Sequence, residues 1–159
     1  MNHIVLYQPE IPQNTGNIGR TCVGTNTHLH LIRPLGFSTD DKHLKRAGCD
    51  YWPNLKVSYY DDAEAFFEEN HPEQIYYIET FGTKNYTDVD FSLPDTDYFL
   101  MFGKESTGIP QELIEAHGGS ERCILIPQSD KVRSLNLSNT VAIVIYEVLR
   151  QQGFAPLKG

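Results

Sequence analysis

The sequence predicts an α/β fold in which a mostly parallel sheet is flanked by helices. Short apolar or alternating segments, typical of strands, recur along the chain between segments of helical periodicity. The expected strands lie at 3–8, 27–33, 74–79, 97–102 and 122–127, with a weaker candidate at 55–60, and the expected helices lie at 15–25, 40–47, 61–70, 110–116 and 136–151. Alternation of this kind implies crossover connections, and these give parallel pairing with helices on both faces.

Local residues agree with these boundaries. Asn14 or Thr15 is placed to cap the first helix, and Pro110 suits the first turn of a later one. The turn-rich segment 81–97 is the longest expected loop, and no linker or repeat divides the chain. We therefore expect residues 1–159 to form a single domain.

Composition narrows the class of protein further. The apolar run at the amino terminus is too short for a secretory signal, and no run of about 18 apolar residues exists. The three cysteines, Cys22, Cys49 and Cys123, fit neither a disulfide framework nor a CxxC pair. We expect a soluble cytoplasmic protein with reduced, mostly buried thiols and no membrane partner.

Charge is unevenly distributed along the chain. The formal net charge of −8 argues against a nucleic-acid partner at first sight. However, residues 47–100 carry 12 acidic against 2 basic residues, whereas residues 1–46 carry 3 against 5. A local basic surface is therefore one outcome and a set of scattered, solvated charges is the other. Its candidate members are Arg20, Arg33, Lys42, Lys45, Arg46, Lys131 and Arg133.

The last expected helix, at 136–151, is apolar on most sides. Positions 141–145, 148 and 149 are all Val, Ala, Ile or Leu. Such a helix needs cover on most of its surface. Either a second subunit covers the side that the sheet leaves open, or the domain wraps the helix completely.

Three polar segments follow predicted strands, at 9–20, 102–110 and 126–139. They are rich in Gly, Asn, Ser and Thr, which expose backbone N–H groups or place short polar side chains near a ligand. Ligands of open α/β sheets bind at the carboxyl ends of the strands. Ordinary turns use the same residues, but three such segments together favour a binding site.

Several familiar sites are absent from the sequence. Neither a Walker A loop nor GxGxxG is present, and no GxSxG surrounds a serine. The six histidines lack HExxH or paired-ligand spacing, and His28 and His30 alternate on an expected strand. No metal site is therefore expected.

The three polar segments together resemble the signature motifs of the SPOUT (SpoU-TrmD) RNA methyltransferases. They read NTGNIGR (14–20), FGKESTGIP (102–110) and IPQSDKVRSLNLSNTVAIVIYE (126–147). The chain length and DDKHLKRAGCDYW (40–52) are similar to the minimal members that act on the wobble nucleotide of tRNA. The resemblance covers nearly the whole chain.

This resemblance implies a fold, a reaction and partners. The carboxyl-terminal segment would be threaded into a deep trefoil knot. The enzyme would transfer a methyl group from S-adenosyl-L-methionine to the ribose 2'-hydroxyl of cytidine 34 or modified uridine 34 of tRNA, leaving S-adenosyl-L-homocysteine and using no metal. It would act as a homodimer with a shared active site and would not act on DNA.

The resemblance also assigns residues. The cofactor-binding residues would be Ile78, Gly103, Ile126, Ser134 and Leu135. The catalytic residues would be Asn14, Arg20, Glu105, Ser134 and Asn136, with Arg20 reaching the cofactor of the other subunit. The RNA-binding residues would be Arg20, Lys45 and Arg46.

Some roles remain open at this point. A guanidinium stays protonated, so Arg20 is better suited to orient the hydroxyl or a phosphate than to act as a base; the alternative is a surface ion pair. Glu105 would fix Arg20, accept the proton or cap the helix that follows it. Tyr51 and Trp52 would stack on a loop base, unless Trp52 is a packing anchor.

Three other functions compete with tRNA methylation. The first is 2'-O-methylation of ribosomal RNA, and the second is RNA binding by a knotted module without catalysis. The third is a small-ligand protein of flavodoxin type, in which aromatic side chains would stack on a flavin. Intact first and third motifs disfavour the non-catalytic module, and a yellow purified protein would favour the flavin.

Overall fold

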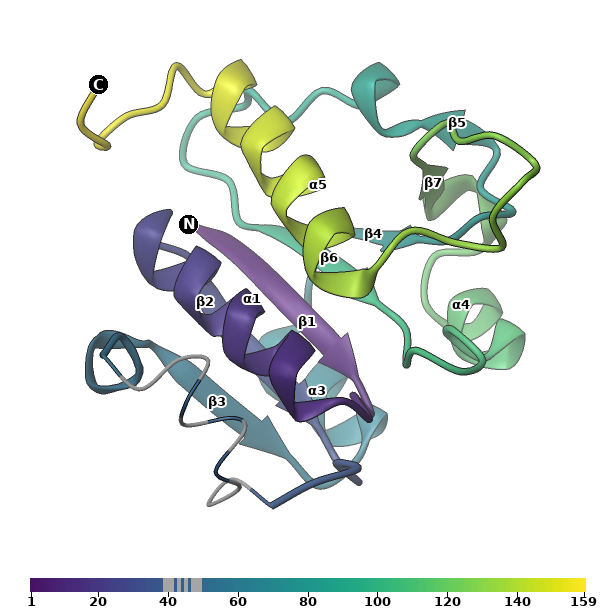
Figure 1. The fold of residues 1–159 in the computed structure, drawn as a ribbon. Coiled ribbons are helices and arrows are strands. Elements are labelled where there is room, and N and C mark those ends of the chain that lie inside the picture. Colours follow the sequence, from purple (N-terminus) through teal and green to yellow (C-terminus); the bar gives the residue numbers. More distant parts are fainter. Residues whose placement is uncertain (39–41, 43, 45, 47–49) are drawn as a thin grey trace.

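The computed structural model describes residues 1–38, 42, 44, 46 and 50–159. Within these residues, seven strands form one sheet in the order β3-β2-β1-β6-β4-β7-β5, and every pairing among them is parallel (Figure 1). The strands are β1 (Asn2–Tyr7), β2 (His28–Ile32), β3 (Val57–Tyr60), β4 (Gln74–Ile78), β5 (Lys84–Asn85), β6 (Tyr98–Phe102) and β7 (Cys123–Leu125). The predicted α/β class with a mostly parallel sheet is confirmed, including the weaker strand candidate.

Alternation along the strands separates two buried layers. On β1, Ile4 and Leu6 face one layer, whereas Val5 faces the other. The same alternation on β6 divides Leu100 from Met101. A sheet buried on both faces explains why its strands read as nearly continuous apolar runs.

Each layer is covered by helices. Helices α1 (Pro12–Gly24) and α5 (Leu137–Gln151) lie side by side on the first face (Figure 1). Helices α3 (Ala63–Asn70) and α4 (Gln111–Ala116) supply Phe66, Phe67 and Ile114 to the layer on the opposite face. Three short 3-10 helices complete the described elements, η1 (Trp52–Asn54), η2 (Tyr86–Asp88) and η3 (Ser120–Arg122).

Some local expectations were wrong. Helix α1 begins at Pro12 after Ile11, so Asn14 and Thr15 lie inside the helix, buried, and do not cap it. The fixed backbone φ angle of Pro12 suits the first turn, so the helix begins at an earlier residue than expected. The segment 81–97 contains β5 and η2, because residues 84–85 pair with β7.

Other expectations are tested only in part by the described residues. Of the helix expected at 40–47, only residues 42, 44 and 46 are among those described. Cys22 and Cys123 are free and buried, as expected, while Cys49 lies outside the described residues. The trefoil knot stays a prediction. Among the described residues, no helix has the length and apolar character needed to cross a membrane.

Candidate functional site

A pocket of about 450 Å³ opens at the carboxyl edge of the sheet. Parallel strands end together at this edge, so the loops after β4, β6 and β7 meet the amino ends of α1 and α5 there. Eight residues assigned from the sequence line this pocket: Asn14, Ile78, Gly103, Glu105, Ile126, Ser134, Leu135 and Asn136. The three polar segments therefore do converge.

The loop after β6 closes on itself at two glycines. The Gly108 N–H donates to the Lys104 carbonyl at 2.9 Å. A Cβ on Gly103 would lie 2.2 Å from the Gly108 carbonyl carbon, which no side chain tolerates. Gly108 itself has a φ of 74°, a left-handed conformation that favours glycine. These two glycines bring the backbone of this loop close to the pocket.

Glu79 is a pocket residue that the sequence analysis missed. Its Oε1 accepts a hydrogen bond from the Ile109 N–H at 2.6 Å, so the carboxyl group ties the loop after β4 to the loop after β6. Burial raises the pKa of Glu79, and its backbone hydrogen bonds oppose this only in part. A carboxylate immediately after an apolar strand was the available signal, but nothing in the local pattern separates it from other acidic residues of that region.

Glu105 holds the start of α1. Its Oε1 accepts from the Glu10 N–H at 2.9 Å, and its Oε2 accepts from the Ile11 N–H at 2.8 Å. The carboxylate therefore meets donors at the positive end of the helix dipole. The suggestion that Glu105 caps the helix after it was wrong, since α4 begins at Gln111 after Pro110 and has no side-chain cap.

Asn14 and Asn136 extend this contact across the pocket. Asn14 Nδ2 donates to Glu105 Oε2 at 3.2 Å, and Asn136 Nδ2 donates to Asn14 Oδ1 at 3.2 Å. Asn136 also caps α5, because its Oδ1 accepts from the N–H groups of Ser138 and Asn139. One polar chain thus links the beginnings of α1 and α5 to the loop after β6.

A second polar contact links the same loops on the outside. Glu10 Oε1 accepts from the Ser106 N–H at 2.8 Å, and Arg133 donates to the Ser106 carbonyl at 3.3 Å. The hydrogen bonds from Ser106 lower the pKa of Glu10. The loops that line the pocket are therefore held to one another by side chains as well as by the sheet.

Arg20 lies outside this pocket. It is exposed on α1, and its guanidinium lies over the Tyr51 ring at 4.7 Å from the centroid. Six residues along a helix rotate a side chain by about 240° from Asn14, so Arg20 cannot point toward the pocket edge that Asn14 occupies. Within one chain, Arg20 is therefore not joined to the other assigned catalytic residues, and Glu105 does not hold it.

The assigned RNA contacts stay predictions. Arg46 is exposed, and Lys45 lies outside the described residues. Trp52 is half-buried against α1, where a Cβ on Gly19 would lie 3.0 Å from its ring. Trp52 therefore packs against α1, and stacking of Tyr51 or Trp52 on a loop base stays a prediction.

Fold and site together define an α/β protein whose ligand pocket is built from strand-end loops. Residues 1–146 match the model of the SpoU rRNA Methylase family, and the chain belongs to that family. The SPOUT resemblance is thereby confirmed.

Three similar proteins have names or descriptions that refer to methylation at position 34 of tRNA. A protein of Listeria innocua, provisionally named a tRNA (cytidine(34)-2'-O)-methyltransferase, is 64% identical over 98% of this chain and 91% of its own length. The tRNA (cytidine(34)-2'-O)-methyltransferase of Escherichia coli K12 is 45% identical over 97% of this chain and 96% of its own. A structure solved for the 2-OH methylation of C/U34 on tRNA is 40% identical with a TM-score of 0.87, covering 96% of this chain and 97% of that one.

Proposed function

We propose that this protein transfers a methyl group from S-adenosyl-L-methionine to the ribose 2'-hydroxyl of nucleotide 34 of tRNA. The observation that carries the proposal is the convergence of three distant loops on one pocket in a chain of this family. The near full-length similarity to the enzyme of Escherichia coli K12 supports the choice of tRNA over ribosomal RNA. We place the reaction in the cytoplasm and within one domain of residues 1–159.

The pocket residues suit this cofactor. Ile78, Ile126 and Leu135 provide apolar walls for an adenine ring, and nearby backbone groups can read its polar edge. Glu79 and Glu105 add carboxylates for the positive charges of the sulfonium and amino groups. Ser134, in the loop before α5, offers a hydroxyl on the same side. These side chains therefore fit S-adenosyl-L-methionine, and in this proposal the reaction uses no metal.

Catalysis then depends chiefly on orientation. The bound cofactor supplies a methyl carbon already activated by its sulfonium, so an in-line attack by the ribose oxygen needs correct placement and loss of one proton. Asn14, Asn136 and Glu105 form a rigid polar row at the pocket and would hold the nucleotide beside it. Arg20 would orient the hydroxyl or an adjacent phosphate and stabilise developing negative charge.

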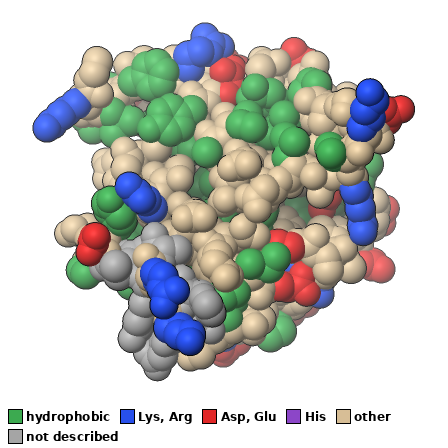
Figure 2. All heavy atoms as spheres, in the orientation of Figure 1, with side chains coloured by type: hydrophobic (Ala, Val, Ile, Leu, Met, Phe, Trp, Pro, Cys, Tyr) green, Lys and Arg blue, Asp and Glu red, His purple; other side chains and the backbone are tan. Residues whose placement is uncertain are grey.

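A homodimer would explain how Arg20 can act at a pocket although it lies outside the pocket of its own chain. The exposed faces of α1 and α5 lie next to each other, and the centre of this side carries few charged side chains (Figure 2). Ile143 and Tyr146 on α5 are 37% and 50% exposed. Burial of this surface against a second copy would cover the apolar helix and would bring Arg20 of one subunit toward the pocket of the other.

Nucleoside mass spectrometry of tRNA from cells with and without this protein tests the proposed function. We expect one 2'-O-methylated nucleoside at position 34 to disappear when the gene is deleted and to return with the wild-type gene. Loss of a methylated nucleoside from ribosomal RNA alone would contradict the choice of substrate. Unchanged tRNA and ribosomal RNA would contradict the enzymatic function.

A further inference from the structure

We propose that His3, His28 and His30 bind a divalent transition-metal ion, and Zn²⁺ is the ion that we expect. The site lies at the amino edge of the sheet, opposite the cofactor pocket. His3 on β1 pairs in register with His28 on β2, and His30 lies two residues further along β2. All three side chains therefore project from the same face of the sheet.

The three rings are close enough to share one ion. Each histidine offers one ring nitrogen, and these nitrogens lie within 4.8 Å of one another. His3 Nδ1 and His30 Nε2 are 2.9 Å apart. Two imidazole nitrogens bound to one tetrahedral Zn²⁺ are separated by about 3.3 Å, given Zn–N bonds of about 2.05 Å. This pair needs to open by only a few tenths of an ångström.

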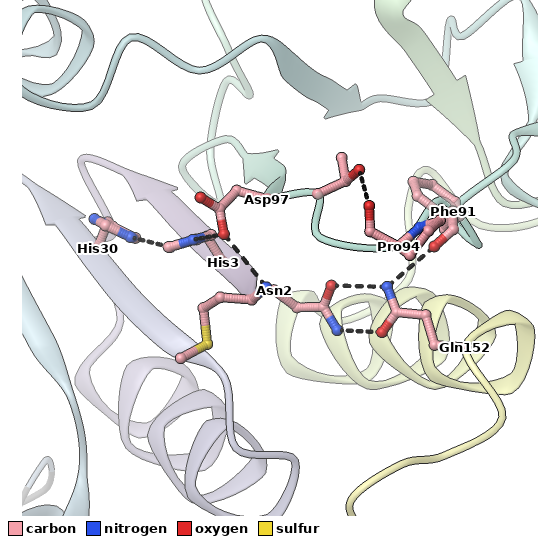
Figure 3. A network of polar contacts seen from close by, with 9 residues as sticks. Asn2, His3, His30, Phe91, Pro94, Asp97 and Gln152 are labelled. Atoms are coloured by element: carbon pink, nitrogen blue, oxygen red, sulfur yellow. Dashed lines mark hydrogen bonds and ion pairs between the residues drawn. The ribbon is translucent and has the colours of Figure 1, made fainter.

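The other nitrogen of each ring faces an oxygen. His30 Nδ1 lies 2.8 Å from the Tyr60 hydroxyl, and His28 Nε2 lies 2.8 Å from Ser58 Oγ. His3 Nε2 lies 3.5 Å from an Asp97 carboxylate oxygen (Figure 3). Metal-binding histidines commonly use their second nitrogen in this way, with a carboxylate or another oxygen that fixes the ring.

One buried atom of this cluster, His3 Nε2, has no hydrogen-bond partner among the residues that the structure describes. An Asp97 carboxylate oxygen lies 3.5 Å from it. His3 as a whole residue is 8% exposed. A cation on Nδ1 would make the ring a stronger donor and would draw the Asp97 carboxylate toward Nε2.

Access to the site is available through His28. His3 and His30 are buried, whereas His28 is half-buried at the start of β2. A fourth ligand position would remain for water, as in open zinc sites with three protein ligands. Because the ligands come from two strands, a search for motif spacing along the chain does not detect them.

Calorimetric titration of chelator-treated protein with Zn²⁺ tests the proposal. We expect one ion per chain, a higher melting temperature with Zn²⁺, and visible absorption typical of four-coordinate Co²⁺ when that ion is used instead. His28→Ala should abolish stoichiometric binding. Asp97→Asn keeps all three ligands and should weaken binding by about 10- to 100-fold.

His71→Asn is the matched control. His71 is an exposed helix-capping residue with a φ of 45°, which asparagine tolerates, and it should not change Zn²⁺ affinity. Wild-type protein that binds no ion in a 1:1 ratio would overturn the proposal. Unchanged binding by both His28→Ala and Asp97→Asn would also overturn it. If His28→Ala fails to fold, the Asp97→Asn affinity decides alone, since Asp97 lies at the exposed edge of the cluster.

Discussion

Asn136 donates a hydrogen bond to Asn14 across the pocket at 3.2 Å, although 122 residues separate them in the chain. Asn14 is 6% exposed and in turn donates a hydrogen bond to Glu105. The beginnings of α1 and α5 are thereby locked to the loop after β6. A buried side chain with a partner at each end positions the site more firmly than three separate loops would.

Asn14→Ala should damage this arrangement. The change removes the acceptor of the Asn136 Nδ2 group and one of the two donors to Glu105 Oε2, which keeps the Ile11 N–H, at a cost of roughly 1–3 kcal/mol. We expect turnover in a tritiated-methyl assay to fall by about 10- to 100-fold if that loss is felt in the transition state. Gln13→Ala, at an exposed position of the same helix, is the control. Equal turnover of both variants would refute the positioning role.

Gly103→Ala should close the pocket to the cofactor. The new Cβ would meet the Gly108 backbone at 2.2 Å, so the loop has to move. Calorimetry should detect no S-adenosyl-L-methionine binding by this variant. Gly24→Ala serves as the control, because a Cβ there meets nothing within 4 Å. Cofactor affinity retained by Gly103→Ala would show that this loop does not form the binding wall.

Arg20→Ala should abolish methyl transfer while leaving cofactor binding nearly intact, because Arg20 lies outside the pocket of its own chain. Mixed dimers of Arg20→Ala with Gly103→Ala test whether the residue acts across subunits. Such a dimer contains one intact pocket facing one intact Arg20 from the other chain. We expect activity to return on mixing, whereas two inactive parents that remain inactive after subunit exchange would contradict the shared site.

Tyr146→Glu should dissociate the proposed dimer. Tyr146 is 50% exposed on α5, and a carboxylate there would be buried without a partner on association. Analytical ultracentrifugation should show a dimer for the wild type and a monomer for the variant. Leu93→Glu, at an equally exposed apolar position in the loop before β6, should remain dimeric. A wild-type monomer would remove the proposed route for Arg20.

Acid should destabilise the metal-free protein through the buried histidines. Burial lowers the pKa of His3 to about 4 and that of His30 to about 2. The unfolded chain binds protons below pH ~6.5, whereas the folded protein does not. The contribution of these two histidines to the free energy of unfolding is therefore fully present above that pH. It decreases as the pH falls toward 4, with a limiting slope of about 1.4 kcal/mol per pH unit for each group.

Urea denaturation of chelator-treated protein between pH 7 and pH 4.5 measures this loss. His3→Gln removes one of these two buried rings and should flatten the dependence on pH, whereas His71→Asn should not. An identical slope for the wild type and His3→Gln would contradict the assignment.

The fold was largely predictable because its signals are local. Strands buried on both faces are nearly continuous apolar runs, and β6 and most of β1 follow that pattern. The start of α1 was less predictable. Its amino end is satisfied by Glu105, which lies more than 90 residues away, so no nearby capping residue announces it.

The site was likewise predictable only in part. Most residues assigned within the three motifs line the pocket, because their sequence neighbours are distinctive, whereas Arg20 lies outside it. Glu79 and the cluster of His3, His28 and His30 were missed because their meaning depends on which strands become neighbours. Pairing between strands is a property of the whole chain, and single-strand periodicity does not determine it.

The most direct test combines purified protein, S-adenosyl-L-methionine and an unmodified tRNA transcript, followed by nuclease digestion and mass spectrometry of the fragments. Our account predicts one added methyl group on the ribose of nucleotide 34, and none when that nucleotide is 2'-deoxy. Methylation of the base, methylation of another nucleotide, or transfer to the 2'-deoxy substrate would contradict it.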